Sequence, residues 1–518
     1  MEYTRQDTLR GALNVARLYG VHYYDLSVTV DIEGNSLLGV NTIHFTTPIE
    51  MDSIQVDLFD RFNILSVKQG ENQLNYREEG NHIFVYLPEK SRTGKSYTIQ
   101  ISYEGKPQEA LKPPWDGGFT WTKDSLGNDW VAVSCQGLGA SSWWPCKDHL
   151  SDEPDSMRIR FTVPRSLTCI SNGQFRGSKT KDSSTEYEWF VSYPINTYNV
   201  TLNIGKYDIL TDSFESNSSE KLRINYYVFP YHKDRAAIYF QEEVTLMLQC
   251  MEKYFGPYPF PRDGYALVET PYWGMEHQSA IAYGNNFNKN DFGFDFIIIH
   301  ESGHEWWGNA VSVRDNAELW LHEALTTYSE ALYMECRHGA DSAQTYLNMQ
   351  RSKIKCDYPL MGTLDVNYSH EDADIYYKGT WMLHTLRHQI GNDSIWFAIL
   401  YSFIEDHKYE TIASGEFIAH ANTVTNSDYT DFFQQYLYIT ALPVLEYQLS
   451  KKGKNTIIRY RWVSEVPDFN MQVLLVSKPG HQYSLAGSTE WTKYKLKKVR
   501  PREVKVMMDK MLINAVEL

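Results

Sequence analysis

The residues that could do chemistry gather in one stretch of the chain, which contains the pattern His300-Glu301-Ser302-Gly303-His304. In a helix, side chains four residues apart point in the same direction, so the two imidazoles can bind one metal ion between them. Glu301 follows at the edge of that face. A carboxylate there can act as general base toward a water that the metal activates, without binding the metal itself. The pattern therefore indicates a hydrolytic metal site.

Two imidazoles leave such a site incomplete, because catalytic zinc usually takes three protein ligands and a water. Glu323 stands nineteen residues after His304, in a second helical pattern over about 321–332 that follows a short connection near Asp315. A carboxylate on this second helix could face the His pair. On spacing alone, other residues compete with Glu323 for the role of third ligand, namely Glu318, His322 and Glu330.

The stretch resembles the aminopeptidase N family of zinc metallopeptidases, within the gluzincins. The resemblance rests on His-Glu-x-x-His, on Trp306-Trp307-Gly308-Asn309 and on Trp320-Leu321-His322-Glu323, with eighteen residues between the second His and the Glu. It implies one zinc ion held by His300, His304 and Glu323, with Glu301 as the base. It also implies that Glu330 supports a ligand histidine by hydrogen bonding, a support that such ligands commonly require.

A second segment, Trp273-Gly274-Met275-Glu276-His277, resembles the family's Gly-x-Met-Glu-Asn exopeptidase motif. Gly274, Met275 and Glu276 fit the motif, whereas Trp273 replaces its first Gly and His277 replaces its Asn. By resemblance, Glu276 pairs with the protonated α-amine of a substrate whose first carbonyl lies at the zinc, so only chains with a free N-terminus fit productively. The backbone N–H groups of Trp273 and Gly274 remain available to the substrate.

Three further site residues are expected at separate points of the chain. The family carries a Tyr two residues before Lys-Gly, and Tyr376 matches it; its hydroxyl would stabilise the oxyanion, with Tyr377 as the adjacent rival. Gln136, in a loop rich in Gly, Ser and aromatic residues, stands where the family has an acidic or amide side chain that binds the substrate amine. Tyr272 is a candidate for contact with the first residue of the substrate.

The composition is that of a globular protein with several domains. The chain has 518 residues, of which 42% are hydrophobic, 14% aromatic and 22% charged. The formal net charge is -16, and no basic run or basic face is evident, which disfavours nucleic acid and anionic membranes as partners. Six cysteines lack C-x-x-C spacing, which argues against a thiolate zinc site. No apolar run is long enough to span a membrane.

The pattern of apolar residues divides the chain into three expected domains, 1–205, 206–438 and 439–518. Alternation typical of strands occurs near 26–45, 97–103, 159–163 and 200–204, which predicts an N-terminal β-sandwich-like domain. Helical spacing dominates from about Ala237 to Leu437, and two short strand patterns flank the exopeptidase segment. Alternation returns after Leu442 and predicts a small C-terminal β-sandwich. The fold class is therefore multidomain α+β, with a thermolysin-like, mostly helical catalytic domain by resemblance.

These observations lead to the expectation of a zinc aminopeptidase that acts on peptides with a free N-terminus. A zinc endopeptidase on the same scaffold is the nearest alternative, and Glu276 is the feature that separates the two. An epoxide hydrolase activity occurs in one branch of the family, but no residue here marks it. A catalytically silent peptide-binding protein is disfavoured because Glu301 has no role in holding zinc. The sequence does not decide between a cytoplasmic protein and an exported one whose leader is absent, and it leaves the oligomeric state open.

Overall fold

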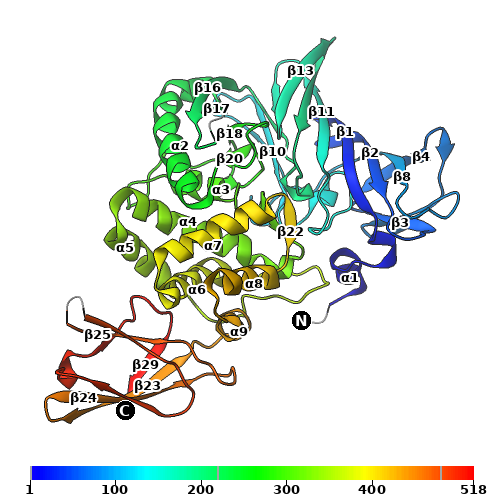
Figure 1. The fold of residues 1–518 in the computed structure, drawn as a ribbon. Coiled ribbons are helices and arrows are strands. Elements are labelled where there is room, and N and C mark those ends of the chain that lie inside the picture. The colour runs from blue at the N-terminus through cyan, green and yellow to red at the C-terminus, as the bar shows by residue number, and fades with distance from the viewer. Residues whose placement is uncertain (1–2, 219–220, 479–480) are drawn as a thin grey trace. The chain divides into compact units, whose positions relative to one another are not determined.

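The computed structural model describes residues 3–218, 221–478 and 481–518, and the chain forms two compact units (Figure 1). The first unit contains Met1–Asn316, Thr363–Ser369 and His407–Ile412. The second unit contains Ala317–Gly362, His370–Asp406 and Ala413–Leu518.

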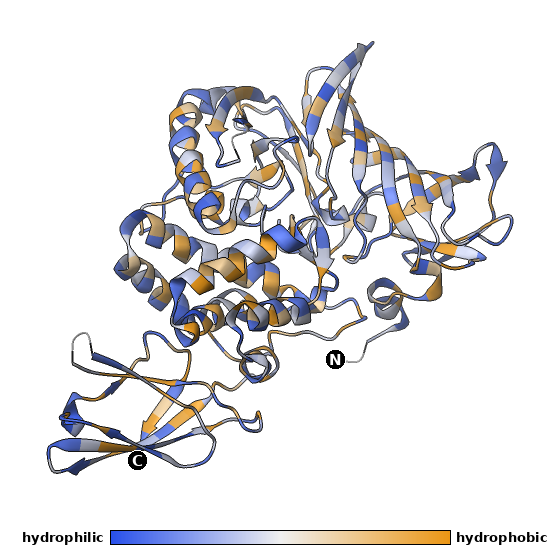
Figure 2. Cartoon of the chain, viewed as in Figure 1, coloured by the Kyte–Doolittle hydropathy of each residue, from blue (hydrophilic) through white to orange (hydrophobic). Residues whose placement is uncertain are grey.

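The first unit begins with a mixed sheet in which the strand order is β13-β14-β11-β1-β2-β8-β4-β5 (Figure 1). Strand β1 pairs antiparallel with β2 and parallel with β11. Hydrophobic and hydrophilic residues alternate along these strands (Figure 2), and β1 and β2 bury nearly every second side chain, as the sequence predicts. The strands are β1 Gly20–Asp31, β2 Ser36–Thr46, β4 Phe62–Gln69, β5 Asn72–Gln73, β8 Ser96–Gly105, β11 Ser156–Pro164, β13 Gln174–Lys181 and β14 Ser184–Val191.

Two smaller sheets, β3-β7-β6 and β12-β15-β10-β9, and helix α1 (Arg5–Gly11) complete the β-rich region. Here one expectation is wrong in part, because the pattern at 200–204 forms a strand only from Asn203. Thr197–Asn199 is a short 3-10 helix, and the Asn172 side chain donates to the backbone oxygen of Asn199 and accepts from the backbone N–H of Thr201, which competes with strand pairing there. The strands are β3 Ser53–Asp57, β6 Tyr76–Glu79, β7 His82–Tyr86, β9 Gly118–Lys123, β10 Asp129–Ser134, β12 Thr168–Ile170 and β15 Asn203–Gly205.

A buried ion cluster around Asp57 fixes the loop that follows Gln136. The Asp57 carboxylate accepts hydrogen bonds from Arg17 Nη2 (2.6 Å) and from the backbone N–H of Asp148 (3.0 Å), and it pairs with His82 Nδ1 at 2.7 Å. Burial alone would raise the pKa of Asp57, but Arg17 and His82 outweigh it and hold the pKa below its ordinary value. Arg17 also donates to the backbone oxygen of Asp148 (2.8 Å), so the cluster ties this loop to the sheet.

The remainder of the first unit is a sheet with the order β16-β17-β18-β20-β19, which carries the exopeptidase segment at its edge. Helix α2 packs on β16 and β17, and α3 packs on β19 and β20 (Figure 1). A separate parallel pair joins β21 to β22. The elements are β16 Asp208–Glu215, β17 Lys221–Val228, α2 Lys233–Phe255, β18 Tyr265–Glu269, β19 Gly274–Met275, β20 Ile281–Tyr283, α3 Phe296–Gly303, β21 Val311–Val313 and β22 Glu410–Ile412.

Helices make up the first part of the second unit, and α4 packs against both α5 and α6 (Figure 1). A Cβ added at Gly379 on α6 would lie 2.5 Å from Ala324 Cβ, so the glycine allows α6 to approach α4 closely. Among the described residues, no helix combines the length and the apolar character that a membrane crossing requires. The helices are α4 Trp320–His338, α5 Ala340–Arg351, α6 Asp374–Ile390, α7 Asp393–His407, α8 Ser414–Thr425 and α9 Thr430–Tyr438.

The chain ends in two sheets, with the orders β27-β24-β23-β29 and β26-β25-β28. The expected strand over 504–508 is reduced to β28. The strands are β23 Val444–Lys452, β24 Asn455–Val463, β25 Val473–Lys478, β26 His481–Leu485, β27 Thr492–Leu496, β28 Lys505–Val506 and β29 Asn514–Glu517.

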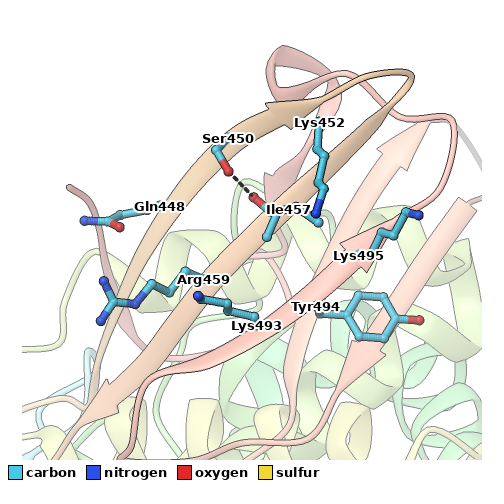
Figure 3. Close-up of a pocket in the computed structure, with 8 residues that line it drawn as sticks. All are labelled: Gln448, Ser450, Lys452, Ile457, Arg459, Lys493, Tyr494 and Lys495. Carbon is cyan, nitrogen blue, oxygen red and sulfur yellow. Dashed lines mark hydrogen bonds between the residues drawn. The ribbon is translucent and has the colours of Figure 1, made fainter.

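One face of the sheet β27-β24-β23 carries a group of cations around a hollow of about 380 Å³ (Figure 3). Cross-strand pairing brings Arg459 opposite Lys493, and Ile457 opposite Lys495, while Lys452 lines the same hollow. The expectation that the chain has no basic face is therefore wrong for this sheet. The cations are far apart in the sequence, and only the strand register brings them together.

Substitution of Asp57 tests the structural role of the buried cluster. We expect Asp57→Ala to destabilise the first unit by about 3–5 kcal/mol, because Arg17 is left as an uncompensated buried charge. The midpoint of thermal unfolding, followed by circular dichroism, should fall by roughly 10 °C. The exposed Asp60→Ala is the matched control and should leave the midpoint unchanged. An equal midpoint for both variants would contradict this account of the cluster.

Candidate active site and metal centre

The two histidines of the motif lie on and directly after helix α3. The helix begins at Phe296 because the Asp295 side chain caps it, accepting hydrogen bonds from the backbone N–H groups of Ile297 and Ile298. One turn of helix separates His300 from His304, and their ring centroids lie 4.9 Å apart. Both side chains are buried. The expected helix and the expected common direction of the two imidazoles are confirmed.

The third residue of the candidate metal centre is Glu323, in the first turn of α4. Ligand atoms of His300, His304 and Glu323 all lie within 4.8 Å of one another. This set of two imidazoles and one carboxylate is typical of catalytic zinc and leaves room for a fourth ligand. His304 Nδ1 lies 2.9 Å from the backbone oxygen of Trp307, to which it can donate, and this tautomer makes Nε2 the nitrogen that would bind the metal. The donor set and this hydrogen bond fit a zinc ion.

Strand β19 approaches α3 most closely at Gly274. A Cβ added at Gly274 would lie 2.6 Å from Glu301 Oε1 and 2.8 Å from Ile297 Cγ2, so only glycine fits there without displacing the carboxylate. The exopeptidase segment therefore lies directly against the candidate base. Met275, the next residue, is buried on the same strand.

Glu276 follows on this segment, and hydrogen bonds from distant parts of the first unit fix it in place. The hydroxyl of Tyr198 donates to Glu276 Oε1 at 2.9 Å. Asn309 Nδ2, just beyond α3, donates to the backbone oxygen of Glu276 at 2.8 Å, and Asn309 Oδ1 accepts from Asn199 Nδ2 at 2.8 Å. The carboxylate is 2% exposed. The β-rich region and the α3 region thus hold the position of this carboxylate together.

Glu305 is a buried acid of the site that the sequence analysis missed. Its carboxylate accepts hydrogen bonds from the backbone N–H of Ser279 (2.9 Å) and from the hydroxyl of Tyr258 (2.7 Å), and a longer one from Asn309 (3.3 Å). Burial raises the pKa of Glu305 to about 8, although these hydrogen bonds oppose the rise. Glu305, just after α3, therefore holds the backbone at Ser279, just after the exopeptidase segment, by a hydrogen bond. The sequence offered one sign of this role, because Glu305 stands between the expected ligand His304 and the apolar residues Trp306 and Trp307.

His277, which replaces the Asn of the family motif, is completely buried. Burial lowers its pKa to about 3, so the imidazole is neutral at pH 7. The substitution therefore adds no positive charge beside Glu276.

The candidate oxyanion residue, Tyr376, lies in the first turn of α6, three residues before Gly379. Its neighbour Tyr377 accepts a hydrogen bond from Lys353 Nζ at 3.3 Å, and the Lys353 ammonium lies 4.8 Å from the Tyr377 ring. The choice between the two tyrosines for the oxyanion role stays a prediction. Both tyrosines lie on α6, the helix that packs closely on α4 at Gly379.

Glu330 and Gln136 are the two remaining residues that the sequence places in the site. Glu330 Oε2 accepts hydrogen bonds from the Tyr346 hydroxyl (2.6 Å) and from Gln350 Nε2 (3.1 Å), both on α5. Gln136 is half-buried directly after β10, and its backbone oxygen accepts from the N–H of Leu138 at 2.8 Å. Their roles toward a ligand histidine and toward the substrate amine stay predictions.

Comparison with known proteins agrees with this geometry. Residues 21–199 match the peptidase M1 N-terminal domain, and residues 239–436 match the peptidase family M1 domain. The two matches together cover more than half of the chain. The chain therefore belongs to peptidase family M1, a family of aminopeptidase N-like gluzincins that hold one zinc ion.

Curated relatives share this region at low identity. The chain is 21% identical to human endoplasmic reticulum aminopeptidase 1 over 350 residues, which are 63% of this chain and 36% of that protein. It is 20% identical to probable aminopeptidase 2 of Sulfurisphaera tokodaii over 499 residues, which are 88% of this chain and 60% of that protein. The matched region thus spans less than two thirds of these relatives.

Solved structures share the fold. The M1 zinc metallopeptidase from Deinococcus radiodurans matches with a TM-score of 0.71 at 21% identity, over 82% of this chain and 95% of that chain. Aminopeptidase A of Legionella pneumophila, in complex with aspartic acid, matches with a TM-score of 0.82 at 15% identity, over 96% of this chain and 60% of that chain. The fold is therefore multidomain, with an N-terminal β-rich domain and a helical catalytic domain like those of M1 peptidases.

Adding one methyl group at Gly274 tests the contact between β19 and the base. We expect Gly274→Ala to reduce kcat/KM on aminopeptidase substrates by about 10- to 100-fold, because the new Cβ displaces the Glu301 carboxylate. Zinc content, measured by mass spectrometry, should not change. Gly20→Ala is the control, because a Cβ added at Gly20 meets nothing within 4 Å. Full activity of Gly274→Ala would show that this approach is not needed for catalysis.

Proposed function

We propose that this protein is a zinc-dependent aminopeptidase that releases N-terminal residues from peptides. The observation that supports this proposal most strongly is the arrangement of Glu276 and Gly274 on one short segment. Glu276, a buried carboxylate fixed by Tyr198, lies two residues from Gly274, which abuts Glu301. Two residues of strand span about 7 Å, so little substrate can lie between an ammonium at Glu276 and a scissile bond beside the base Glu301. The names of the relatives, aminopeptidases and zinc metallopeptidases, agree with this activity.

In this mechanism the chain's own residues bind the substrate and move its protons. Glu276 and Gln136 hold the N-terminal ammonium, and the backbone of Gly274 and Met275 lies beside the substrate chain. A zinc ion on His300, His304 and Glu323 supplies polarisation of the carbonyl and a lowered pKa for the attacking water. Glu301 accepts the proton of that water and delivers it to the leaving amine, while the Tyr376 hydroxyl donates to the developing oxyanion. Glu330 supports a ligand histidine by hydrogen bonding.

The finer architecture belongs to the same proposal. We assign an N-terminal β domain to 1–205, a thermolysin-like catalytic domain to 206–438 and a β-sandwich domain to 439–518. Sheet β16-β17-β18-β20-β19 and helices α2 to α9 all fall within 206–438, which supports the second assignment, and the two sheets that follow from Val444 support the third.

Paired peptides with free and with acetylated N-termini test the proposed function. Wild type should cleave only the free peptides. Glu276→Gln keeps the size of the side chain but loses its charge, so kcat/KM on free peptides should fall by about 10- to 100-fold. Glu242→Gln, an exposed glutamate on α2, is the matched control and should behave as wild type.

Two other results would replace the proposal. Equal cleavage of free and acetylated peptides would make the protein an endopeptidase. Failure to cleave either peptide with zinc bound would leave a peptide-binding protein.

A further inference from the structure

A series of four aromatic rings, which we name the aromatic ladder, leads from the surface of the first unit to a candidate zinc ligand. Its members are Trp115, Trp273, Phe296 and His300. The ring centroids of Trp115 and Trp273 are 6.4 Å apart, those of Trp273 and Phe296 are 5.6 Å apart, and those of Phe296 and His300 are 5.3 Å apart. The last pair is stacked, with an angle of 26° between the rings. All three distances are typical of aromatic pairs in contact.

The outer two rings of the ladder are exposed, which is unusual in this chain. Trp115 is 73% exposed and Trp273 is 46% exposed, whereas eight other tryptophans of the described chain are less than 2% exposed. Neighbouring exposed aromatic rings are a feature of binding sites, because each ring offers a large apolar surface at a low cost in side-chain entropy. Phe296 and His300 continue the surface inward to the candidate metal centre.

Hydrogen bonds preset the orientation of the Trp273 indole. Trp273 Nε1 donates to Asn285 Oδ1 at 3.0 Å, and Asn285 Nδ2 donates to Asp295 Oδ1 at 2.8 Å. Asp295 caps α3, so the indole is tied to the helix that carries the catalytic residues. The backbone N–H of Trp115 donates to the backbone oxygen of Lys112 at 3.0 Å, which fixes the turn that carries this residue. A preset ring loses little entropy when a ligand binds to it.

The order of residues along the exopeptidase segment places the ladder relative to the substrate. Glu276 marks the position of the substrate amine, and Gly274 lies against the base Glu301. Trp273 comes next, on the side of Gly274 away from Glu276. A peptide with its amine at Glu276 and its first peptide bond at Glu301 therefore has its second residue beside Trp273 and later residues toward Trp115.

We propose that the aromatic ladder is a subsite for an aromatic side chain on the second residue of the substrate, the residue that follows the cleaved bond. This inference rests on the aminopeptidase function proposed above and names its substrate class: peptides with Phe, Tyr or Trp in the second position. Trp273 is the specificity-determining residue, and Trp115 extends the contact. Stacking on a preset indole favours an aromatic ring over a methyl group by about tenfold in kcat/KM.

Peptides of sequence Leu-Xaa-Ala-Ala, with Ala, Leu, Phe or Trp as Xaa, test the subsite. Release of Leu by wild type, measured by mass spectrometry, should be about tenfold more efficient for Phe and Trp than for Ala. In Trp273→Ala this ratio should fall below about threefold, whereas Trp273→Phe should keep most of it. Trp115→Ala should reduce the ratio partly. Ile238→Ala, 75% exposed on α2, is the control and should retain the wild-type ratio.

The ratio compares two peptides with the same variant, so any loss of folded or active enzyme affects both values equally and does not change it. A wild-type ratio near one, or an unchanged ratio in Trp273→Ala, would overturn the subsite while leaving the aminopeptidase function in place. If wild type cleaves none of the peptides, the proposed function itself fails.

Discussion

The close approach of β19 to α3 at Gly274 is the constraint on which the candidate site depends. It sets the distance between the carboxylate that would hold the substrate amine and the carboxylate that would act as base. Hydrogen bonds on both sides maintain it. Tyr198 and Asn309 fix Glu276, and Glu305 holds the backbone of Ser279. Because several elements determine this geometry together, a shift of one of them would change the position of the amine relative to the scissile bond.

Burial explains why the site needs so many hydrogen bonds. Glu276, Glu301, Glu305 and Glu323 are each at most 8% exposed. A buried carboxylate is costly unless hydrogen bonds or a cation compensate it. Glu305 is compensated by hydrogen-bond donors alone, and its raised pKa reflects the remaining cost of burial. In the proposed mechanism, the substrate ammonium and the zinc ion compensate the others.

The sequence predicted the elements that have strong periodicity and the residues that belong to a spaced motif. Helices α3 and α4 and the alternating strands β1 and β2 follow from local patterns, and so do His300 and His304. The Glu323 assignment came from the resemblance, because spacing left three rivals. Contacts between distant segments were not predictable. Asn172 bonds the backbone at Asn199 and Thr201, where the 200–204 pattern does not yet form a strand, and strand register alone gathers Arg459 with Lys493. The exopeptidase motif showed that Trp273 departs from the family pattern. Only the aromatic rings that contact it in the structure suggest that its side chain binds substrate.

Zinc content, compared with activity in two variants, tests the central claim most directly. The account separates the residues that hold the metal from the residue that moves the proton. Glu301→Gln should therefore keep about one zinc per chain after dialysis and lose activity by about 10²- to 10⁴-fold. Glu323→Ala should lose both zinc and activity. If Glu301→Gln loses zinc as readily as Glu323→Ala, or if Glu323→Ala retains a full zinc ion, the assignment of ligands and base is contradicted.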